Sequence, residues 1–286
     1  MKSVKDFFEL IKFEHTIFAL PFAYLGMLIA AGGLPELYLV FWITIAMAAA
    51  RTLAMGVNRI VDRWIDSHNP RTANRPLVTG RISLQVAWIG TIIAGLFFIL
   101  AAWKLGPLPF YLSPIALIFL IGYSYTKRLT WSSHFILGFT DGLAPIGAWI
   151  AIRQSLFSVE DIQAWILLLI VTTWIGGFDL IYSCQDIQYD RQDNLYSIPL
   201  KFGVGFALYL SSICHILTLI LLGTLGIMLS LNWPYWIGFI IIAILLIWEH
   251  TLVKPDDLSK INVAFFNINS YISITLFLAI LISIYI

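Results

Sequence analysis

Residues 84–103 read LQVAWIGTIIAGLFFILAAW, a run of twenty residues that contains no charged side chain. An α-helix of about 20 apolar residues crosses the hydrocarbon core of a bilayer, so this stretch is predicted to be a transmembrane helix. The whole chain has the same character, because 60% of its 286 residues are hydrophobic and 12% are charged. Soluble domains carry about a quarter charged residues. Too little polar surface remains to cover a water-soluble globule, and an integral membrane protein is predicted.

Eight further apolar stretches are similar to this one. The predicted spans lie near residues 16–33, 38–58, 84–103, 108–125, 133–152, 162–183, 204–230, 233–250 and 261–286. The first is interpreted as a retained membrane helix and not as a cleaved signal peptide, because acidic residues precede it and eight spans follow. The expected fold is all-α, a polytopic bundle of nine transmembrane helices. Residues 1–286 are treated as one domain, with an N-terminal half of about 1–130 and a C-terminal half of about 131–286.

Lysine and arginine are distributed unequally between the two sides of such a bundle. Fourteen of them precede span one or follow spans two, four, six and eight, whereas Lys104 and Arg153 lie on the opposite side. Cytoplasmic loops of membrane proteins carry the excess of positive charge. The N-terminus is therefore expected in the cytoplasm and the C-terminus outside, in a cytoplasmic (inner) membrane. The net charge of +1 excludes bulk attraction to nucleic acid, and no nucleic-acid partner is expected.

The segment after the second span carries a first cluster of polar residues. Asn58, Asp62 and Asp66 are four residues apart, so on a helix they project from one face on successive turns. Stacked carboxylates repel one another unless a divalent cation binds between them, and hard oxygen ligands favour magnesium. These three residues are therefore predicted ligands of Mg²⁺. Arg51 lies seven residues before Asn58, on the same face and about two turns deeper.

The loop after the sixth span repeats these spacings of 7, 4 and 4 residues. Its members are Asp179, Asp186, Asp190 and Asn194. A shift of 128 residues superimposes this set on the one that begins at Arg51, which indicates two pseudo-repeated halves around a central cavity. Asp186 and Asp190 are predicted metal ligands. Asn194 stands where a third acidic residue would extend the motif, so it is left out of the predicted ligand set.

Two acidic clusters that face one cavity are typical of a site where magnesium ions hold a diphosphate. The cations predicted to complete the grip on the diphosphate are Arg71, Arg75, Lys127 and Arg128. The alternative for Lys127 and Arg128 is that they only enforce topology, as loop cations do. Turnover is expected to depend most on the carboxylates in the middle of each cluster, Asp62 and Asp190.

Arg51 is expected to act differently, because a cation inside a span is costly and marks a functional site by default. Its guanidinium offers a planar, two-pronged grip, so Arg51 is predicted to bind the carboxylate of an aromatic substrate, with Asp179 beside it. The alternative is a structural ion pair between Arg51 and Asp179. The five histidines lack metal-ligand spacing and are interpreted as bystanders, and Cys184 and Cys214 as free packing residues.

These residues resemble the motifs of the UbiA superfamily of membrane prenyltransferases. The stretches that carry the resemblance are Asn58-Arg59-x-x-Asp62-x-x-x-Asp66, residues 71–77 (RTANRPL), residues 123–128 (YSYTKR) and Asp186-x-x-x-Asp190. Together with nine spans they cover nearly the whole chain. The resemblance implies Mg²⁺-dependent transfer of a prenyl group from a polyprenyl diphosphate to a ring carbon of an aromatic carboxylic acid, at loops that face the cytoplasm.

Within the superfamily, the chain is most similar to the 4-hydroxybenzoate polyprenyltransferase group of ubiquinone and menaquinone biosynthesis. Residues 12–21 (KFEHTIFALP) and 177–182 (GFDLIY) resemble instead a branch linked to the futalosine route to menaquinone, which would prenylate 1,4-dihydroxy-6-naphthoate. A secondary transporter is the non-enzyme alternative, since it too can combine internal repeats with buried charges. Transport sites lie near the midplane of the membrane, whereas these clusters lie at its edge.

Overall fold

A computed structural model describes residues 2–12 and 14–286, and the side chains of 5–12 and 20–286. The described chain is almost entirely helical and contains no β-strand, which confirms the all-α prediction. Most of the stretch 12–21, which bears on the choice of branch, lies outside the described side chains. The helices are α1 (Lys2–Leu10), α2 (Glu14–Ala31), α3 (Leu37–Val61), α4 (Arg63–His68), α5 (Leu84–Leu105), α6 (Pro107–Thr126), α7 (Ser133–Arg153), η1 (Val159–Asp161), α8 (Ile162–Ser183), α9 (Ile187–Gln192), α10 (Ile198–Phe202), α11 (Val204–Met228), α12 (Trp233–Leu252), η2 (Val263–Ile268) and α13 (Asn269–Tyr285).

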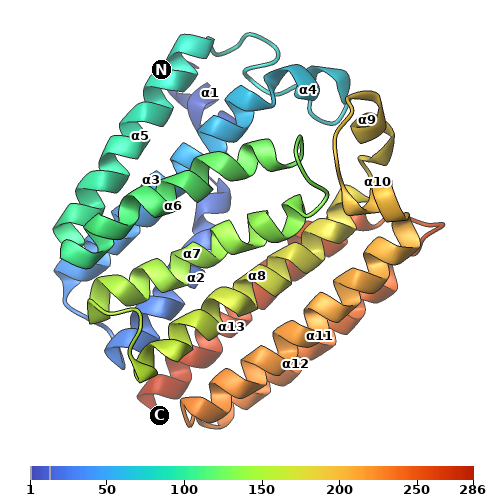
Figure 1. The fold of residues 1–286 in the computed structure, drawn as a ribbon. Helices are drawn as coiled ribbons and strands as arrows, with labels where there is room; N and C mark the ends of the chain where they lie inside the picture. The colour runs from blue at the N-terminus through green and yellow to red at the C-terminus, as the bar shows by residue number, and fades with distance from the viewer. Residues whose placement is uncertain (1, 13) are drawn as a thin grey trace.

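The long helices correspond to the predicted spans. Eight segments of the described chain are long and apolar enough to cross a membrane, formed by α3, α5, α6, α7, η1 with α8, α11, α12 and η2 with α13. The remaining predicted span is α2, which has 18 residues and is about 27 Å long at 1.5 Å per residue. The bundle therefore accommodates the nine spans that hydropathy predicts (Figure 1).

Close packing between neighbouring helices depends on glycine. A Cβ on Gly138 of α7 would lie 2.4 Å from the carbonyl oxygen of Thr172 in α8, and one on Gly142 would lie 2.8 Å from that of Leu168. Two glycines four residues apart therefore let the α7 and α8 backbones meet. Apolar burial gains little inside lipid, so van der Waals contact of this kind is what holds membrane helices together.

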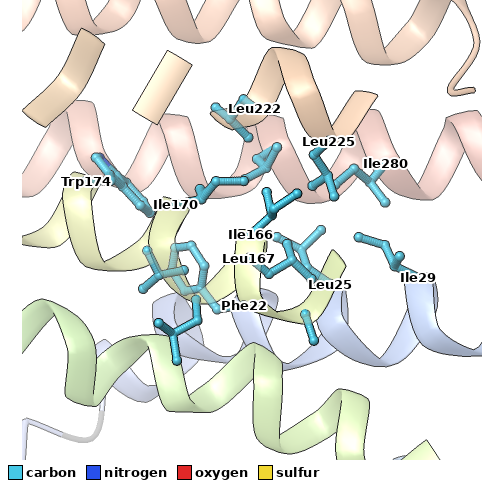
Figure 2. Close-up of a cluster of buried hydrophobic side chains, with 14 of the residues drawn as sticks. Phe22, Leu25, Ile29, Ile166, Leu167, Ile170, Trp174, Leu222, Leu225 and Ile280 are labelled. Atoms are coloured by element: carbon cyan, nitrogen blue, oxygen red, sulfur yellow. The ribbon is translucent and has the colours of Figure 1, made fainter. Parts of the chain in front are cut away.

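A large apolar cluster fills the space between α2, α8, α11 and α13. Figure 2 shows Phe22 from α2 near Ile170 and Trp174 from α8, and Leu25 from α2 near Leu167, with Leu222 from α11 on the other side of α8. All six are buried. This cluster fixes α8, the helix that leads into the second acidic motif, against its neighbours.

The two acidic motifs lie at the same end of the bundle. In Figure 1 the short helices α4 and α9 lie side by side there, and the C-terminus lies at the opposite end. His68 Nδ1, at the end of α4, is 2.8 Å from Asp193 Oδ1, just after α9. The amide of Tyr196 also donates to the carbonyl of Lys127 (2.7 Å), which joins the loop after α6 to the loop after α9.

The structural register of the repeat differs from the register that the spacing predicts. Asp62 ends α3 and begins the six-residue α4, and Asp186 begins the six-residue α9, both in a right-handed helical conformation. In each case the backbone amide of the second aspartate, Asp66 or Asp190, donates to the backbone carbonyl of the first (2.8 Å). The local geometry thus matches Asp62 with Asp186 and Asp66 with Asp190, a shift of 124 residues in place of 128. Arg51 and Asp179 are then not equivalent positions.

Candidate active site

One cavity of about 730 Å³ collects nearly all of the predicted site residues. Its lining includes the predicted residues Arg51, Asn58, Asp62, Asp66, Arg71, Arg75, Lys127, Asp179, Asp186 and Asp190. Arg128 is the one predicted residue that is absent from the lining. Residues from α3, α6, α7, α8, α9 and the loop after α4 thus meet at one end of the bundle.

Asp62 is held by two cations from the end of α6. Lys127 Nζ donates to Asp62 Oδ2 (2.5 Å), and the guanidinium of Arg128 donates to Asp62 Oδ1 (2.9 Å). Asn58 also donates to Asp62 over 3.1 Å. The side chain of Asp62 is 3% exposed, so burial without these partners would be costly. Arg128 therefore touches the site through Asp62, from outside the cavity.

The loop after α4 joins the two motifs. Arg75 donates to Asp66 of its own motif (2.5 Å), whereas Arg71 crosses the cavity and donates to Asp186 of the other (2.7 Å). Asn69 donates to the second oxygen of Asp186 (2.9 Å) and accepts the amide of Arg71 (3.0 Å). Both oxygens of Asp186 are thus bound by residues that follow the first motif.

Asp190 has a different environment. Its carboxylate accepts a hydrogen bond from the Ser197 hydroxyl (2.9 Å), which lies before α10. Burial raises the pKa of Asp190 to about 6, and this hydrogen bond only partly opposes the shift. Asn194 follows in a left-handed turn (φ 54°) and is exposed, outside the cavity lining. The extended motif therefore contributes no third residue here.

The chemistry of the donor set fits magnesium. Four carboxylates and the Asn58 amide offer oxygen atoms around the cavity, which are the ligands that this ion prefers. Within the described residues, no three acidic, histidine or cysteine side chains converge closely enough to hold a metal ion. Most of the carboxylates bond to arginine or lysine instead, so binding of a metal requires these pairs to exchange partners.

Arg51 lies on the cavity wall, on the stretch of α3 that precedes Asn58. Its Nε atom is buried and has no hydrogen-bond partner. Asp141 of α7 and Tyr123 of α6 interact with it electrostatically. Asp179 bonds instead to His134 Nδ1 (2.7 Å). Among the described residues, Arg51 and Asp179 therefore do not form an ion pair with each other.

His134 is a site residue that sequence reasoning missed. It lines the cavity from the first turn of α7, and its Nε2 accepts a hydrogen bond from the backbone amide of Ile198 (3.3 Å). Nε2 is therefore the unprotonated nitrogen, and Nδ1 carries the hydrogen that is donated to Asp179. No spacing rule marks this histidine, because its partners come from α8 and α10.

Tyr182 is a second missed residue. Its hydroxyl accepts a hydrogen bond from Arg71 (2.7 Å), and the guanidinium carbon of Arg71 lies 5.0 Å from the centre of the tyrosine ring. Phe265 of η2 stacks on the same ring, with 3.9 Å between ring centres. Tyr182 lies between Asp179 and Asp186, within the stretch 177–182 that carries part of the resemblance, but its residue type alone does not distinguish it from lipid-facing aromatic residues.

Comparisons with curated proteins point to one family. The 4-hydroxybenzoate octaprenyltransferase of Cupriavidus pinatubonensis is 28% identical over 239 residues, which is 82% of this chain and 81% of that protein. The protein of the same name from Methylobacillus flagellatus is 28% identical over 260 residues, 91% of this chain and 86% of that one.

Solved structures share the fold. A UbiA homologue from Aeropyrum pernix, solved in its apo form, has a TM-score of 0.86 and 31% identity, and the match covers 94% of this chain and 98% of that one. A UbiA homologue from Archaeoglobus fulgidus bound to DMAPP and Mg²⁺ has a TM-score of 0.65 at 18% identity, over 95% of this chain and 99% of that one.

The model of the UbiA prenyltransferase family matches residues 19–271, a range that includes both acidic motifs and the cation-bearing loops between them. This match covers most of the chain. The chain therefore belongs to the UbiA prenyltransferase family.

Proposed function

We propose that the protein transfers a polyprenyl group from a polyprenyl diphosphate to a ring carbon of an aromatic acid, 4-hydroxybenzoate or a similar compound, in quinone biosynthesis. One observation carries the proposal. Both acidic motifs, with cations bound to them, line one cavity whose wall also holds an arginine that lacks a full set of partners. The names of the 28% identical relatives support the choice of acceptor.

The diphosphate is proposed to bind at the mouth of the cavity. Asn58, Asp62 and Asp66 on one side and Asp186 and Asp190 on the other would hold Mg²⁺. When bound, this ion neutralises phosphate charge and makes diphosphate a better leaving group.

The cations already in place would then exchange their carboxylate partners for phosphate oxygens. Arg71, Arg75, Lys127 and Arg128 all lie within hydrogen-bond distance of motif carboxylates. Phosphate is an equally good acceptor for a guanidinium fork or an ammonium. The proposed role of these four residues is to bind the diphosphate and stabilise its charge as it leaves.

The aromatic acid is proposed to bind deeper, with its carboxylate on Arg51 and its ring near Asp179. The allylic carbon–oxygen bond breaks, the electron pair leaves with diphosphate, and the ring carbon beside the phenol forms the new carbon–carbon bond. That ring carbon then loses its proton and aromaticity returns. Water must be excluded during this step because it would capture the allylic cation. The prenyl tail is expected to lie in the bilayer or in an apolar passage open to it.

The acceptor is the part of the proposal most in need of a test. Arg51 suits any aromatic carboxylate, so 1,4-dihydroxy-6-naphthoate is the second candidate, supported by the resemblance of residues 177–182. Purified protein, Mg²⁺ and a labelled prenyl diphosphate should be offered both acids in competition. Preferential labelling of 4-hydroxybenzoate is expected. Preferential labelling of the naphthoate would move the protein to the other branch, and labelling of neither acid would refute the proposal.

We also propose that the protein lies in the inner membrane with its N-terminus and both acidic loops in the cytoplasm. The position of the cavity at one end of the bundle supports this arrangement, because an amphiphilic diphosphate would present its head there. Prenyl diphosphate, the aromatic acid and the lipid bilayer are the expected partners.

A further inference from the structure

A network of buried polar side chains lies behind the cavity wall, between α8, α12 and α13. Its centre is Asn269, the first residue of α13, which is 7% exposed. Asn269 accepts a hydrogen bond from Trp174 Nε1 (2.7 Å) and donates to Glu249 Oε1 (3.3 Å). Glu249 is 0% exposed within α12, where an ionisable residue is costly and needs an explanation. The roles proposed above for the cavity residues do not provide one.

Asn269 also bonds through its side chain to the backbone of the preceding turn. Residues Val263–Ile268 form the π-helical turn η2, and the backbone amide of Asn269 donates to the carbonyl of Phe266. The side-chain amide of Asn269 donates to the carbonyls of Phe265 (3.0 Å) and Ala264 (3.1 Å), both within this turn. π-Helical turns are rare and are frequently found at functional sites. Asn269 therefore stabilises this turn through hydrogen bonds to two of its carbonyls.

The turn places two aromatic residues in the cavity wall. Phe265 and Phe266 both line the cavity. Phe265 stacks on Tyr182, with ring centres 3.9 Å apart and an interplanar angle of 26°, and meets Phe178 edge-on at 5.1 Å. Because η2 is wider than an α-turn, its removal would rotate Phe265 away from this stack.

Tyr182 in turn holds Arg71. The tyrosine hydroxyl accepts a hydrogen bond from one guanidinium nitrogen of Arg71 (2.7 Å). Another guanidinium nitrogen donates to the carboxylate of Asp186 (2.7 Å). The side chain of Arg71 is 34% exposed, and a long, partly exposed side chain loses entropy when it is fixed. Its orientation thus depends on the ring beneath it, and that ring depends on Phe265.

We propose that Asn269 and Glu249 are positioning residues for prenyl transfer. Through η2, Phe265 and Tyr182 they hold Arg71 in the direction that lets it grip the diphosphate. Neither residue touches substrate. This inference rests on the function proposed above, in which Arg71 binds the diphosphate.

The test separates positioning from general stability by kinetics. Couplings through packed networks of this kind are about 0.5–2 kcal/mol, so Asn269→Ala should raise the KM for prenyl diphosphate about 2- to 30-fold. The KM for the acceptor should not change, because Arg51 lies on α3. Glu249→Leu should behave like Asn269→Ala, whereas Glu249→Gln keeps an oxygen acceptor for Asn269 and should restore the KM to within about twofold.

Thr218→Val is the matched control. Thr218 is also buried, on α11, and its hydroxyl bonds to Thr173 of α8 and to the carbonyl of Cys214, so these hydrogen bonds do not involve η2. It should leave both KM values unchanged even if it lowers the thermal midpoint. An equal rise in KM in Asn269→Ala and Thr218→Val would overturn the proposal, as would a normal KM in Asn269→Ala.

Hydrogen exchange provides a readout that needs no substrate. Exchange of the backbone amides of residues 262–270 should accelerate in Asn269→Ala and Glu249→Leu, and not in Thr218→Val or Glu249→Gln. Unchanged exchange in Asn269→Ala would overturn the positioning role by itself. If the wild-type protein turned over no prenyl diphosphate, the proposed function would fail while the exchange result still decided whether Asn269 holds the turn.

Discussion

Asp62 and its two cations illustrate how the site is organised at the scale of single residues. A carboxylate that is 3% exposed is balanced by Lys127 and Arg128, and both of these are also groups that bind phosphate well. Opposite charges thus neutralise one another before any substrate arrives. Substrate and metal together bring both signs of charge, so the pairs can exchange partners without leaving a buried charge alone.

The metal motifs give the first prediction. Asp62→Ala or Asp190→Ala should lower turnover at least about 100-fold, a loss typical of removing one preorganised electrostatic group from an active site. Both variants should still accumulate in the membrane, because the long apolar helices are unaltered. Turnover and membrane content should be measured side by side, with Asp256→Ala as the control, since Asp256 is exposed and lies outside the cavity lining. Near-normal turnover in either motif variant at limiting Mg²⁺ would refute the two-cluster hypothesis.

Arg51 gives the second prediction. Loss of a charge-assisted, two-pronged contact should cost about 2–4 kcal/mol of binding, so Arg51→Ala should raise the acceptor KM about 30- to 1,000-fold. The KM for prenyl diphosphate should change little, whereas Arg71→Ala should show the reverse pattern. Arg51→Lys should rescue only partly, because an ammonium lacks the planar fork. Steady-state kinetics with each substrate varied in turn decides the point. A selective effect of Arg51→Ala on prenyl diphosphate would assign Arg51 to the diphosphate grip.

At the scale of helices, hydropathy located the spans well because lipid demands about 20 apolar residues of every crossing helix. The breaks within and after helices were harder to predict. The sequence spacing matched Arg51 with Asp179, yet α3 continues to Val61 while α8 ends at Ser183. Where a helix stops depends on which neighbour satisfies its last carbonyls, and a one-dimensional pattern does not contain that neighbour.

The same limit applies to the candidate site. Residues with regular spacing, such as Asp62 and Asp66, could be found because they share a helix face. His134 could not, because its partners lie 45 and 64 residues away in sequence, and the bonds of Asn269 to Trp174 and Glu249 span 95 and 20 residues. The π-turn before Asn269 could not be predicted either, since its sequence is ordinary for a membrane helix.

Helix contact gives the third prediction. Gly138→Ala would place a methyl group 2.4 Å from the Thr172 carbonyl, so α7 and α8 must separate, at a cost of about 1–3 kcal/mol of stability. Gly147→Ala on the same helix is the matched control, because nothing lies within 4 Å of the added Cβ. The thermal midpoint in detergent should fall in Gly138→Ala and stay level or rise in Gly147→Ala. Equal midpoints in both variants would show that close contact at Gly138 contributes no stability.

At the scale of the whole molecule, charge and geometry agree about which end of the bundle carries the site. The cation-rich loops that follow α3, α6 and α8 are the ones that meet at the cavity. The same residues can therefore set the topology and bind phosphate. This double use explains why the two interpretations of Lys127 and Arg128 could not be separated from sequence, and why the orientation of the protein bears directly on its proposed function.

Orientation gives the last prediction, which uses single cysteines as labels. Ser67 and Asn194 are exposed at the end that carries the acidic motifs, and Val159 is 92% exposed in the loop between α7 and α8. Cys184 and Cys214 are the two cysteines of the sequence and both are buried, so a Cys184→Ala, Cys214→Ala background keeps these sites apolar and leaves no competing thiol. Because positive loops remain in the cytoplasm, an impermeant maleimide should label Ser67→Cys and Asn194→Cys in inverted membrane vesicles. The same reagent should not label them when it is applied from outside to cells whose inner membrane is intact. Val159→Cys should show the opposite pattern. Labelling of Ser67→Cys and Asn194→Cys from different sides would mean that the two motifs face different compartments, and a single diphosphate could not bridge them.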